Sequence, residues 1–370
     1  MIHALRQRFL GDEQSRFTSG VVLAALLLVA PFLLGPVKTA VLIEVLLFAI
    51  FATAFNLLYG YTGLLSFGHA MFVAVSAYAA AKFFRTIGPA LGFDQLFGGV
   101  SVLMTFAGAI VTGVVLATVL AVLVGYLSVK LEEIYFAMIT LSFSMAIYVV
   151  INQDISGQVG ELLGLGGLLA TNGSDGLTIP YSATGQVDLF GFSFQLMNIT
   201  SYNTFYFIVL LFFAGAMYTI WRITRSPFGE VCTAIRENPE RARALGIDVT
   251  RHSWATFVIS GAFSGLMGAL YAPLLSNVSP GLAYWSFSAE PVIMTVIGGP
   301  YSFLGPLAGS FLYEVLRWFI SQVPALEAHW QLVFGFILLL AVLFFENGAA
   351  GGLERLRARL FGEDGEETGE

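Results

Sequence analysis

The stretch that decides the fold is AVLIEVLLFAIFATAFNLLYG, from Ala40 to Gly60, which contains one charged residue, Glu44. It is apolar on every side, whereas a soluble helix carries polar residues on one face. Its length matches the roughly 20 residues that an α-helix needs to cross a bilayer. The whole chain of 370 residues is 57% hydrophobic and 11% charged, with a mean hydropathy of +0.81. The sequence therefore predicts an all-α, polytopic integral membrane protein in contact with lipid.

Similar apolar runs along the chain predict about ten transmembrane or half-spanning helices. Two of them, 62–82 and 287–300, contain Gly, Ser, His or Pro and are expected to be interrupted. Irregular backbone is tolerated at membrane depth only when it is buried in protein or lines a cavity. Whether these two segments cross fully or re-enter is left open. The predicted spans are 20–35, 39–59, 62–82, 99–125, 134–151, 203–221, 254–274, 287–300, 303–322 and 330–346.

Basic residues predict the orientation in a cell membrane. The chain has no Lys or Arg from Leu131 to Trp221, whereas 222–252 holds six arginines. Because cytoplasmic loops are enriched in Lys and Arg, we expect the 152–202 loop outside and the 222–252 loop in the cytoplasm. The permease domain then covers 20–346, between a cytoplasmic segment, 1–19, and an acidic cytoplasmic tail, 347–370. The first of these lacks the apolar core and cleavage site of a signal peptide.

Composition also limits the chemistry that the chain can perform. The four histidines have no metal-ligand spacing, and no G-x-S-x-G, H-E-x-x-H or phosphate-binding loop occurs. The single cysteine, Cys232, excludes an internal disulfide. We expect no enzymatic activity, no cofactor, no metal and no nucleic-acid partner, so any ATP hydrolysis belongs to a partner chain. The net charge of −7 suggests a high-salt habitat.

The 222–252 loop predicts two short helices. Ser226 followed by Pro227 fits an N-cap with proline at the first helical position, and Phe228, Val231 and Ile235 then share one face. The same pattern repeats at once in RENPERARALG, Arg236 to Gly246.

In the second helix Asn238 caps, Pro239 opens and Gly246 ends the helix. A helix of about seven residues is not stable alone in water, so it must dock on something. Its apolar side, Ala242 and Leu245, is expected to pack on its own loop or in a groove of a partner.

The longer stretch ENPERARALGIDVTRHSWATFVISGAFSGLMGALYAP, 237–273, resembles the coupling loop and following span of the branched-chain amino acid permeases of ABC importers, the LivM and LivH type. It is also similar to the E-A-A-x-x-x-G loop of ABC import permeases, although Arg241 replaces the first Ala and no I-x-L-P follows. The resemblance implies that this loop lies in a cleft of an ATP-binding subunit. The residues expected to couple to the ATPase are Arg236, Glu237, Glu240, Arg241, Ala242, Leu245 and Gly246.

Three further stretches resemble the same family: NLLYGYTGLLSFGHAMFVAVSAYAAA (56–81), SAEPVIMTVIGGPYSFLGPLAGS (288–310) and TNGSDGL (171–177). In the second, Pro291 is expected to open a short helix that Gly298 to Pro300 ends. Broken helices aim dipole ends and freed backbone groups at a cavity. The residues predicted to line a translocation path are Asn56, Ser66, His69 and Glu290. The alternative is helix packing with a satisfied buried histidine.

The resemblance implies an ABC importer for branched-chain amino acids. Its expected partners are a second homologous permease subunit, two cytoplasmic ATP-binding subunits and an extracytoplasmic solute-binding protein. Permeases for urea or short amides in the same family remain an alternative. An ion-coupled secondary transporter is less favoured, because its relay would rest on a few ionisable residues: Glu44, His69, Glu290, Glu314 and Arg317.

Overall fold

The computed structural model describes residues 25–93, 100–164, 166–179, 186–189, 192–195, 202–322, 332 and 335–336. The 1–19 segment, nearly all of the predicted span 330–346 and the acidic tail lie outside the described residues. The longer helices are α2 (Pro36–Thr62), α3 (His69–Lys82), α6 (Ser101–Ser128), α7 (Glu133–Asn152), α9 (Asn203–Thr224), α12 (Val249–Leu275), α13 (Trp285–Gly298) and α14 (Gly305–Ser321). Shorter helices are α4 (Gly88–Ala90), α8 (Ile155–Leu162), α10 (Pro227–Glu237) and α11 (Pro239–Ala244).

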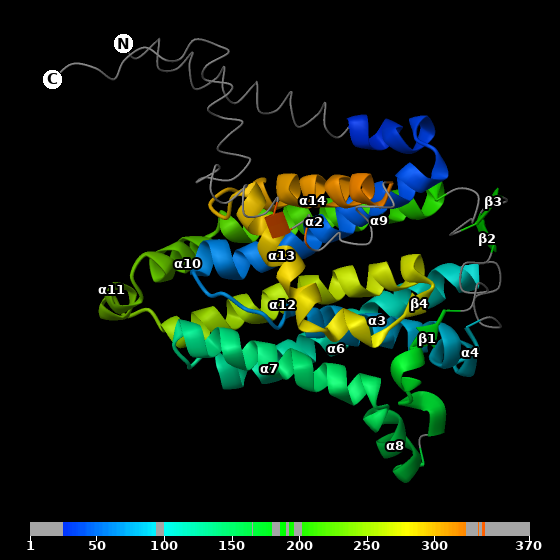
Figure 1. The fold of residues 1–370 in the computed structure, drawn as a ribbon, viewed down its shortest axis with the longest axis horizontal. Helices are drawn as coiled ribbons and strands as arrows, with labels where there is room; N and C mark the ends of the chain where they lie inside the picture. The colour runs from blue at the N-terminus through cyan, green and yellow to red at the C-terminus, as the bar shows by residue number, and fades with distance from the viewer. Residues whose placement is uncertain are drawn as a thin grey trace.

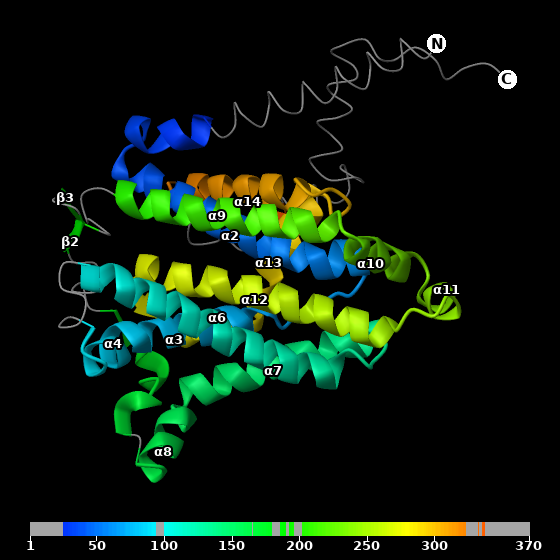
Figure 2. The same cartoon turned by 180° about the vertical axis from the view of Figure 1, so that it is seen from behind.

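Within the residues that the structure describes, four short strands form two separate antiparallel pairs. Strand β1 (Leu177–Thr178) pairs with β4 (Asn277–Val278), and β2 (Gln186–Leu189) pairs with β3 (Phe192–Gln195). Figures 1 and 2 show α2, α9 and α14 along one side of a helical bundle and α3, α6, α7 and α12 along the other.

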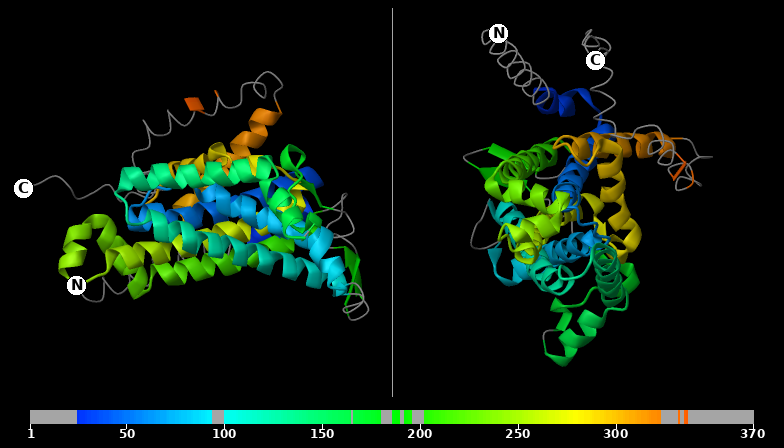
Figure 3. Two further views of the ribbon diagram at one scale, coloured as in Figure 1. Left: turned by 90° about the horizontal axis from the view of Figure 1, so that it is seen from below. Right: turned by 90° about the vertical axis from the view of Figure 1, so that its left-hand side faces the viewer.

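The two ends of the bundle differ in what covers them. Helices α10 and α11 lie at one end, and α4, α8 and the strands lie at the opposite end (Figures 1 and 2). In Figure 3, α8 projects away from the bundle, while α10 and α11 extend beyond the ends of the neighbouring helices. The described residues of the loops 152–202 and 222–252 therefore lie at opposite ends of the protein. This agrees with the prediction that the two loops lie on opposite sides of the membrane. Which end faces the cytoplasm stays a prediction.

Within the described residues, six helices are long and apolar enough to cross a membrane: Pro36–Thr62, His69–Ala90, Ser101–Ser128, Ile134–Asn152, Asn203–Thr224 and Val249–Leu275. The predicted count of about ten is not confirmed. Helices α13 and α14 have 14 and 17 residues and fall short of a full crossing by this measure.

Two non-helical segments interrupt the bundle. The first break, residues 63–68, separates α2 from α3, and the second break, residues 299–304, separates α13 from α14. The expectation that Pro291 opens a helix is wrong, because α13 starts at Trp285 and carries Pro291 inside it. Proline removes one backbone hydrogen bond and crowds the carbonyl of Phe287, four residues earlier, but a helix packed among others in a membrane protein tolerates this, and α13 continues through the buried Pro291.

Small residues bring α12 and α6 against α3. A Cβ at Gly268 would lie 2.3 Å from the carbonyl oxygen of Val73, and a Cβ at Gly113 would lie 2.5 Å from Oγ of Ser76. The same serine hydroxyl donates to the carbonyl of Gly265 at 2.6 Å. Close backbone approach and interhelical hydrogen bonds are the main adhesive forces where lipid removes the hydrophobic driving force between helices.

This packing predicts unequal effects of one substitution at two helical glycines. Gly268→Val should destabilise the protein by about 1–3 kcal/mol or more, because a backbone oxygen cannot swing away from the new side chain. Gly215→Val is the control, since no heavy atom lies within 4 Å of its added Cβ. Thermal unfolding in mild detergent measures both. Equal melting temperatures for the two variants would contradict the packing described here.

Candidate functional site

The two breaks meet at the end of α2. Gly63 ends this helix with φ of +83°, a left-handed conformation that L side chains rarely adopt. A Cβ at Gly60 would lie 2.2 Å from the carbonyl oxygen of Pro300 in the second break. The last turn of α2, the first break and the second break therefore form one contact region.

A chain of polar groups crosses the bundle from the first break. The Nδ1 atom of His69 lies 3.0 Å from Oγ of Ser66, and its Nε2 atom lies 2.8 Å from Oγ of Ser260 on α12. The Ser260 hydroxyl donates to the carbonyl of Ala54 on α2 at 2.6 Å, so Ser260 accepts from His69. For a neutral imidazole this places the proton on Nε2 and leaves Nδ1 to accept from Ser66.

The surroundings of His69 are aromatic. Its ring makes edge-to-face contacts with Phe55, Phe72 and Phe257 at centroid distances of 5.3, 5.6 and 5.9 Å. His69 and Ser66 are both fully buried. These two of the predicted path residues lie together. Their hydrogen bonds join α3 to α12 and, through Ser260, to α2, and neither side chain is exposed in this conformation.

Asn56 and Glu290 are placed differently. Asn56 is 1% exposed, and within the described part of the chain neither polar atom of its side chain has a hydrogen-bond partner. Glu290 receives a hydrogen bond from Tyr313, while its Oε2 atom is buried without a partner among the described residues. A buried polar atom without a partner costs free energy, and functional sites are one place where such atoms are retained.

Further ionisable residues lie on α14 near Glu290. Glu314 and Arg317 pair on α14 at 3.8 Å, and Glu314 is 1% exposed. Only their spacing of three residues was visible in the sequence. Sequence reasoning missed Ser260 and expected Ser288 to cap a helix, whereas Ser288 lies inside α13 and its Oγ accepts from the backbone N–H of Ala70 at 2.9 Å. Serines in apolar helices were the available signal, but their partners are far away in sequence.

One hollow lies beside the first break, and another lies at the opposite end of the bundle. An apolar hollow of about 530 Å³ follows the first break and the start of α7, and it is lined by Tyr59, Gly63, Leu65, Phe67, Ile134, Ala137, Met138 and Leu141. A more polar hollow of about 420 Å³ is lined by Tyr148, Asn152, Ser174, Ser279, Pro280, Gly281, Tyr284 and Ser286.

The two helices predicted for the 222–252 loop are confirmed as α10 and α11. Helix α10 follows Ser226 and begins with Pro227. Helix α11 follows Asn238, whose Oδ1 accepts from the backbone N–H of Arg241 at 2.8 Å. Gly246, with φ of +86°, lies just beyond the end of α11 and turns the chain toward α12.

The expected apolar side of α11 divides between two environments. Ala242 is 2% exposed and packs with Ile235 and Val249, whereas Leu245, which caps the end of α11, is 77% exposed. Packing on the loop itself is therefore confirmed for Ala242, and docking of Leu245 in a partner groove stays a prediction. Glu240 pairs with Arg243 and stays exposed, as does Arg241.

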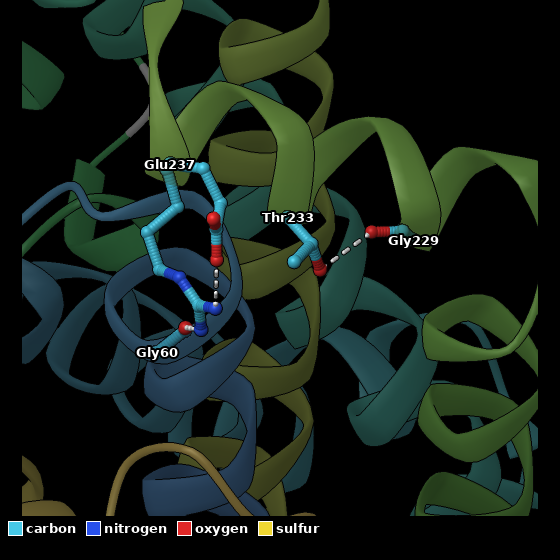
Figure 4. A network of polar contacts seen from close by, with 5 residues as sticks. Gly60, Gly229, Thr233 and Glu237 are labelled. Carbon is cyan, nitrogen blue, oxygen red and sulfur yellow. Dashed lines mark hydrogen bonds and ion pairs between the residues drawn. The ribbon is translucent and has the colours of Figure 1, made fainter.

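Arg236 and Glu237 end α10 and pair with each other, but they differ in exposure. Nη1 of Arg236 donates to the carbonyl of Gly60 at 2.6 Å, and its Nη2 atom lies 3.3 Å from Oε1 of Glu237 (Figure 4). The side chain of Arg236 is 25% exposed, against 68% for Glu237. Arg236 thus points into the protein, toward the contact region of the two breaks.

Comparison with known proteins identifies the family. Residues 38–343 match the family model described as "Branched-chain amino acid transport system / permease component". The LivM permease protein of the high-affinity branched-chain amino acid transport system of Salmonella typhimurium is 25% identical, over 94% of this chain and 78% of that protein. A probable LivM of Methanocaldococcus jannaschii is 24% identical, over 82% of this chain and 90% of its own.

A sugar permease also matches, over a shorter region. The galactose/methyl galactoside import permease protein MglC of Escherichia coli is 27% identical, over 38% of this chain and 42% of that protein. No solved structure matches the chain.

The polar chain through His69 yields a prediction about stability. Ser260→Ala leaves Nε2–H of His69 and the carbonyl of Ala54 without this partner, which should cost about 1–3 kcal/mol in a buried setting. Ser142→Ala is the matched control, because Ser142 is exposed and bonds only to Met138 in its own helix. Chemical unfolding in detergent, followed by tryptophan fluorescence, compares the two. A loss for Ser142→Ala as large as that for Ser260→Ala would refute the assignment.

Proposed function

Because the chain belongs to the permease family of branched-chain amino acid transport systems, we propose that it is the membrane-spanning subunit of an ABC importer for these amino acids. It forms part of the translocation path in a cell membrane and takes its energy from ATP hydrolysed by partner subunits. Its apolar helices and its relatives, which are permease proteins, support this proposal.

The observation that carries the coupling proposal is the exposed tip formed by α10, α11 and the turn after them. It presents an apolar side chain, Leu245, surrounded by exposed charges on Glu237, Glu240 and Arg241. A large apolar residue within a charged rim is typical of a surface that enters a groove on a partner. The proposed occupant of this surface is one of two ATP-binding subunits, which places this end of the bundle in the cytoplasm.

The opposite end then faces outward and receives solute from a binding protein. Its loop is fixed near the end of α7, where Asp154 Oδ1 accepts from the backbone N–H of Thr171 at 2.6 Å. The polar hollow at Tyr148 and Tyr284 adjoins this loop through Asn152 and Ser174. The remaining partner is a second homologous permease, which completes the path.

The predicted path residues divide into two roles. Ser66 and His69 hold the first break, because their polar atoms are used within the protein. Asn56 and Glu290 retain polar atoms without partners in the described part of the chain, and these become available to water or solute when the breaks move with α10. Nucleotide drives this movement by favouring one of two states and does not touch the solute.

The proposed solute class rests on the extent of similarity. LivM proteins match along most of the chain, whereas the galactose permease matches less than half of it. Urea or short amides are the alternative within the family, and an ion-coupled carrier is the alternative mechanism.

Uptake by the purified complex in proteoliposomes tests the solute and the energy source together. Leucine uptake should require ATP inside and binding protein outside, and it should survive ionophores that collapse ion gradients. Urea and galactose should not accumulate. Uptake driven by an ion gradient without ATP would instead identify a secondary carrier.

The exposed tip predicts a loss of ATPase binding in one of two matched leucine variants. Leu245→Asp should weaken co-purification of the ATP-binding subunit by about tenfold or more, since a buried apolar anchor typically contributes 2 kcal/mol or more. Leu162→Asp is the control, because this leucine is 87% exposed at the opposite end. Glu240→Arg and Gly246→Pro should also uncouple transport while the membrane domain stays folded. Normal leucine uptake by Leu245→Asp would disprove the proposal that Leu245 docks on an ATP-binding subunit.

A further inference from the structure

Arg236 makes contacts that a partner-facing residue would not make. Among the charged residues at the ends of α10 and α11, the side chain of Arg236 is 25% exposed, whereas Glu237 and Glu240 are 68% and 79% exposed. The sequence placed all three in one ATPase-facing set. The structure distinguishes them by burial, because Arg236 reaches the carbonyl of Gly60 in the bundle, whereas Glu237, although it pairs with Arg236, and Glu240 stay exposed.

The first contact of Arg236 is with the end of α2. The carbonyl of Gly60 belongs to the last turn of this helix, where carbonyl groups lack a partner within the helix. The Arg236 guanidinium donates to it at 2.6 Å, and a cation is favoured at the negative end of the helix dipole. The stem of Arg236 also lies over Gly63, where a Cβ would be 3.2 Å from its Cγ. Arg236 therefore holds both the last turn of α2 and the start of the first break.

The second contact is with the second break. The guanidinium carbon of Arg236 lies 5.0 Å from the ring centroid of Tyr301, within the range of a cation–π interaction. Tyr301 follows Pro300, whose carbonyl packs directly on Gly60. One side chain from α10 thus touches both interrupted segments at the point where they meet.

We propose that Arg236 is the positioning residue that transmits movement of α10 to both breaks. This inference rests on the proposed function, because the movement of α10 is the one driven by the ATP-binding subunit. A planar guanidinium can donate to a carbonyl and stack on a ring at the same time, which the point charge of lysine cannot reproduce. Arg236 therefore links the tip that meets the ATPase to the backbone that opens the path.

The test compares uptake with ATP hydrolysis in the complete complex in proteoliposomes. In Arg236→Gln the ATP-binding subunits should still co-purify and hydrolyse ATP, while leucine taken up per ATP falls about tenfold, within the usual range of coupling energies. Arg236→Lys should recover part of this loss. Arg225→Gln is the matched control, because Arg225 stacks on Trp221 at 4.8 Å beside the same end of the bundle and should leave the ratio unchanged.

Tyr301→Ala provides a second route to the same conclusion, and it carries the test if Arg236→Gln does not accumulate in the membrane. Tyr301 is 77% exposed, so its truncation should not unfold the protein. The uptake per ATP should fall, and the double variant should lose less than the product of the two single losses, because both changes remove one linkage.

Three results would overturn the proposal. Unchanged uptake per ATP in Arg236→Gln or in Tyr301→Ala would show that the linkage transmits nothing. Loss of the ATP-binding subunits from the Arg236→Gln complex would make Arg236 a partner contact. Absence of ATP-dependent uptake in the unaltered complex would overturn the proposed function itself, whatever Arg236 does.

Discussion

An interrupted helix inside a membrane has to find hydrogen-bond partners for its freed backbone groups within the protein, because lipid supplies none. The rest of this structure depends on how the two breaks meet that constraint. At the first break, Oγ of Ser66 accepts from the N–H of Gly68, and Oγ of Ser288 accepts from the N–H of Ala70. Arg236 satisfies the carbonyl of Gly60. These donors and acceptors come from α10 and α13 as well as from the break itself.

The same constraint explains why the loop and the membrane helices behave as one mechanism in our proposal. A break that takes its partners from several helices cannot move alone. Any movement of α10 must either carry the end of α2 with it or leave a carbonyl of its last turn unsatisfied. Small residues on α12 hold three helices together, since Gly268 packs on the backbone of Val73 in α3 and Gly265 packs on Cβ of Ala117 in α6. The protein thus combines a tightly packed side with a polar contact region suited to two arrangements.

The sequence predicted those features that depend on local pattern. Apolar runs located the long helices, and glycine with serine located the first break after Thr62. Capping residues placed α10 and α11 almost to the residue, because Asn238 and Pro239 act on their own neighbours. Features that depend on distant partners were not predictable in this way. The inward turn of Arg236 requires Gly60, and the pairing of His69 with Ser260 joins residues on separate helices. The exposure of Leu245 was not predictable either, because the pattern left open whether it packs on its own loop or in a partner groove.

The central claim, that α10 and the second break move together, is tested most directly by distances between spin labels. Labels at Glu230 on α10 and at Leu304 in the second break report on this pair, because both side chains are exposed and neither belongs to the linkage through Arg236. A label at the exposed Lys130 beyond α6 serves as the fixed reference. Burial raises the pKa of the native Cys232 thiol, which keeps it from competing for the label. On adding ATP to the whole complex, the 230–130 distance should change while the 230–304 distance stays constant. A 230–304 distance that changes with nucleotide would contradict the account.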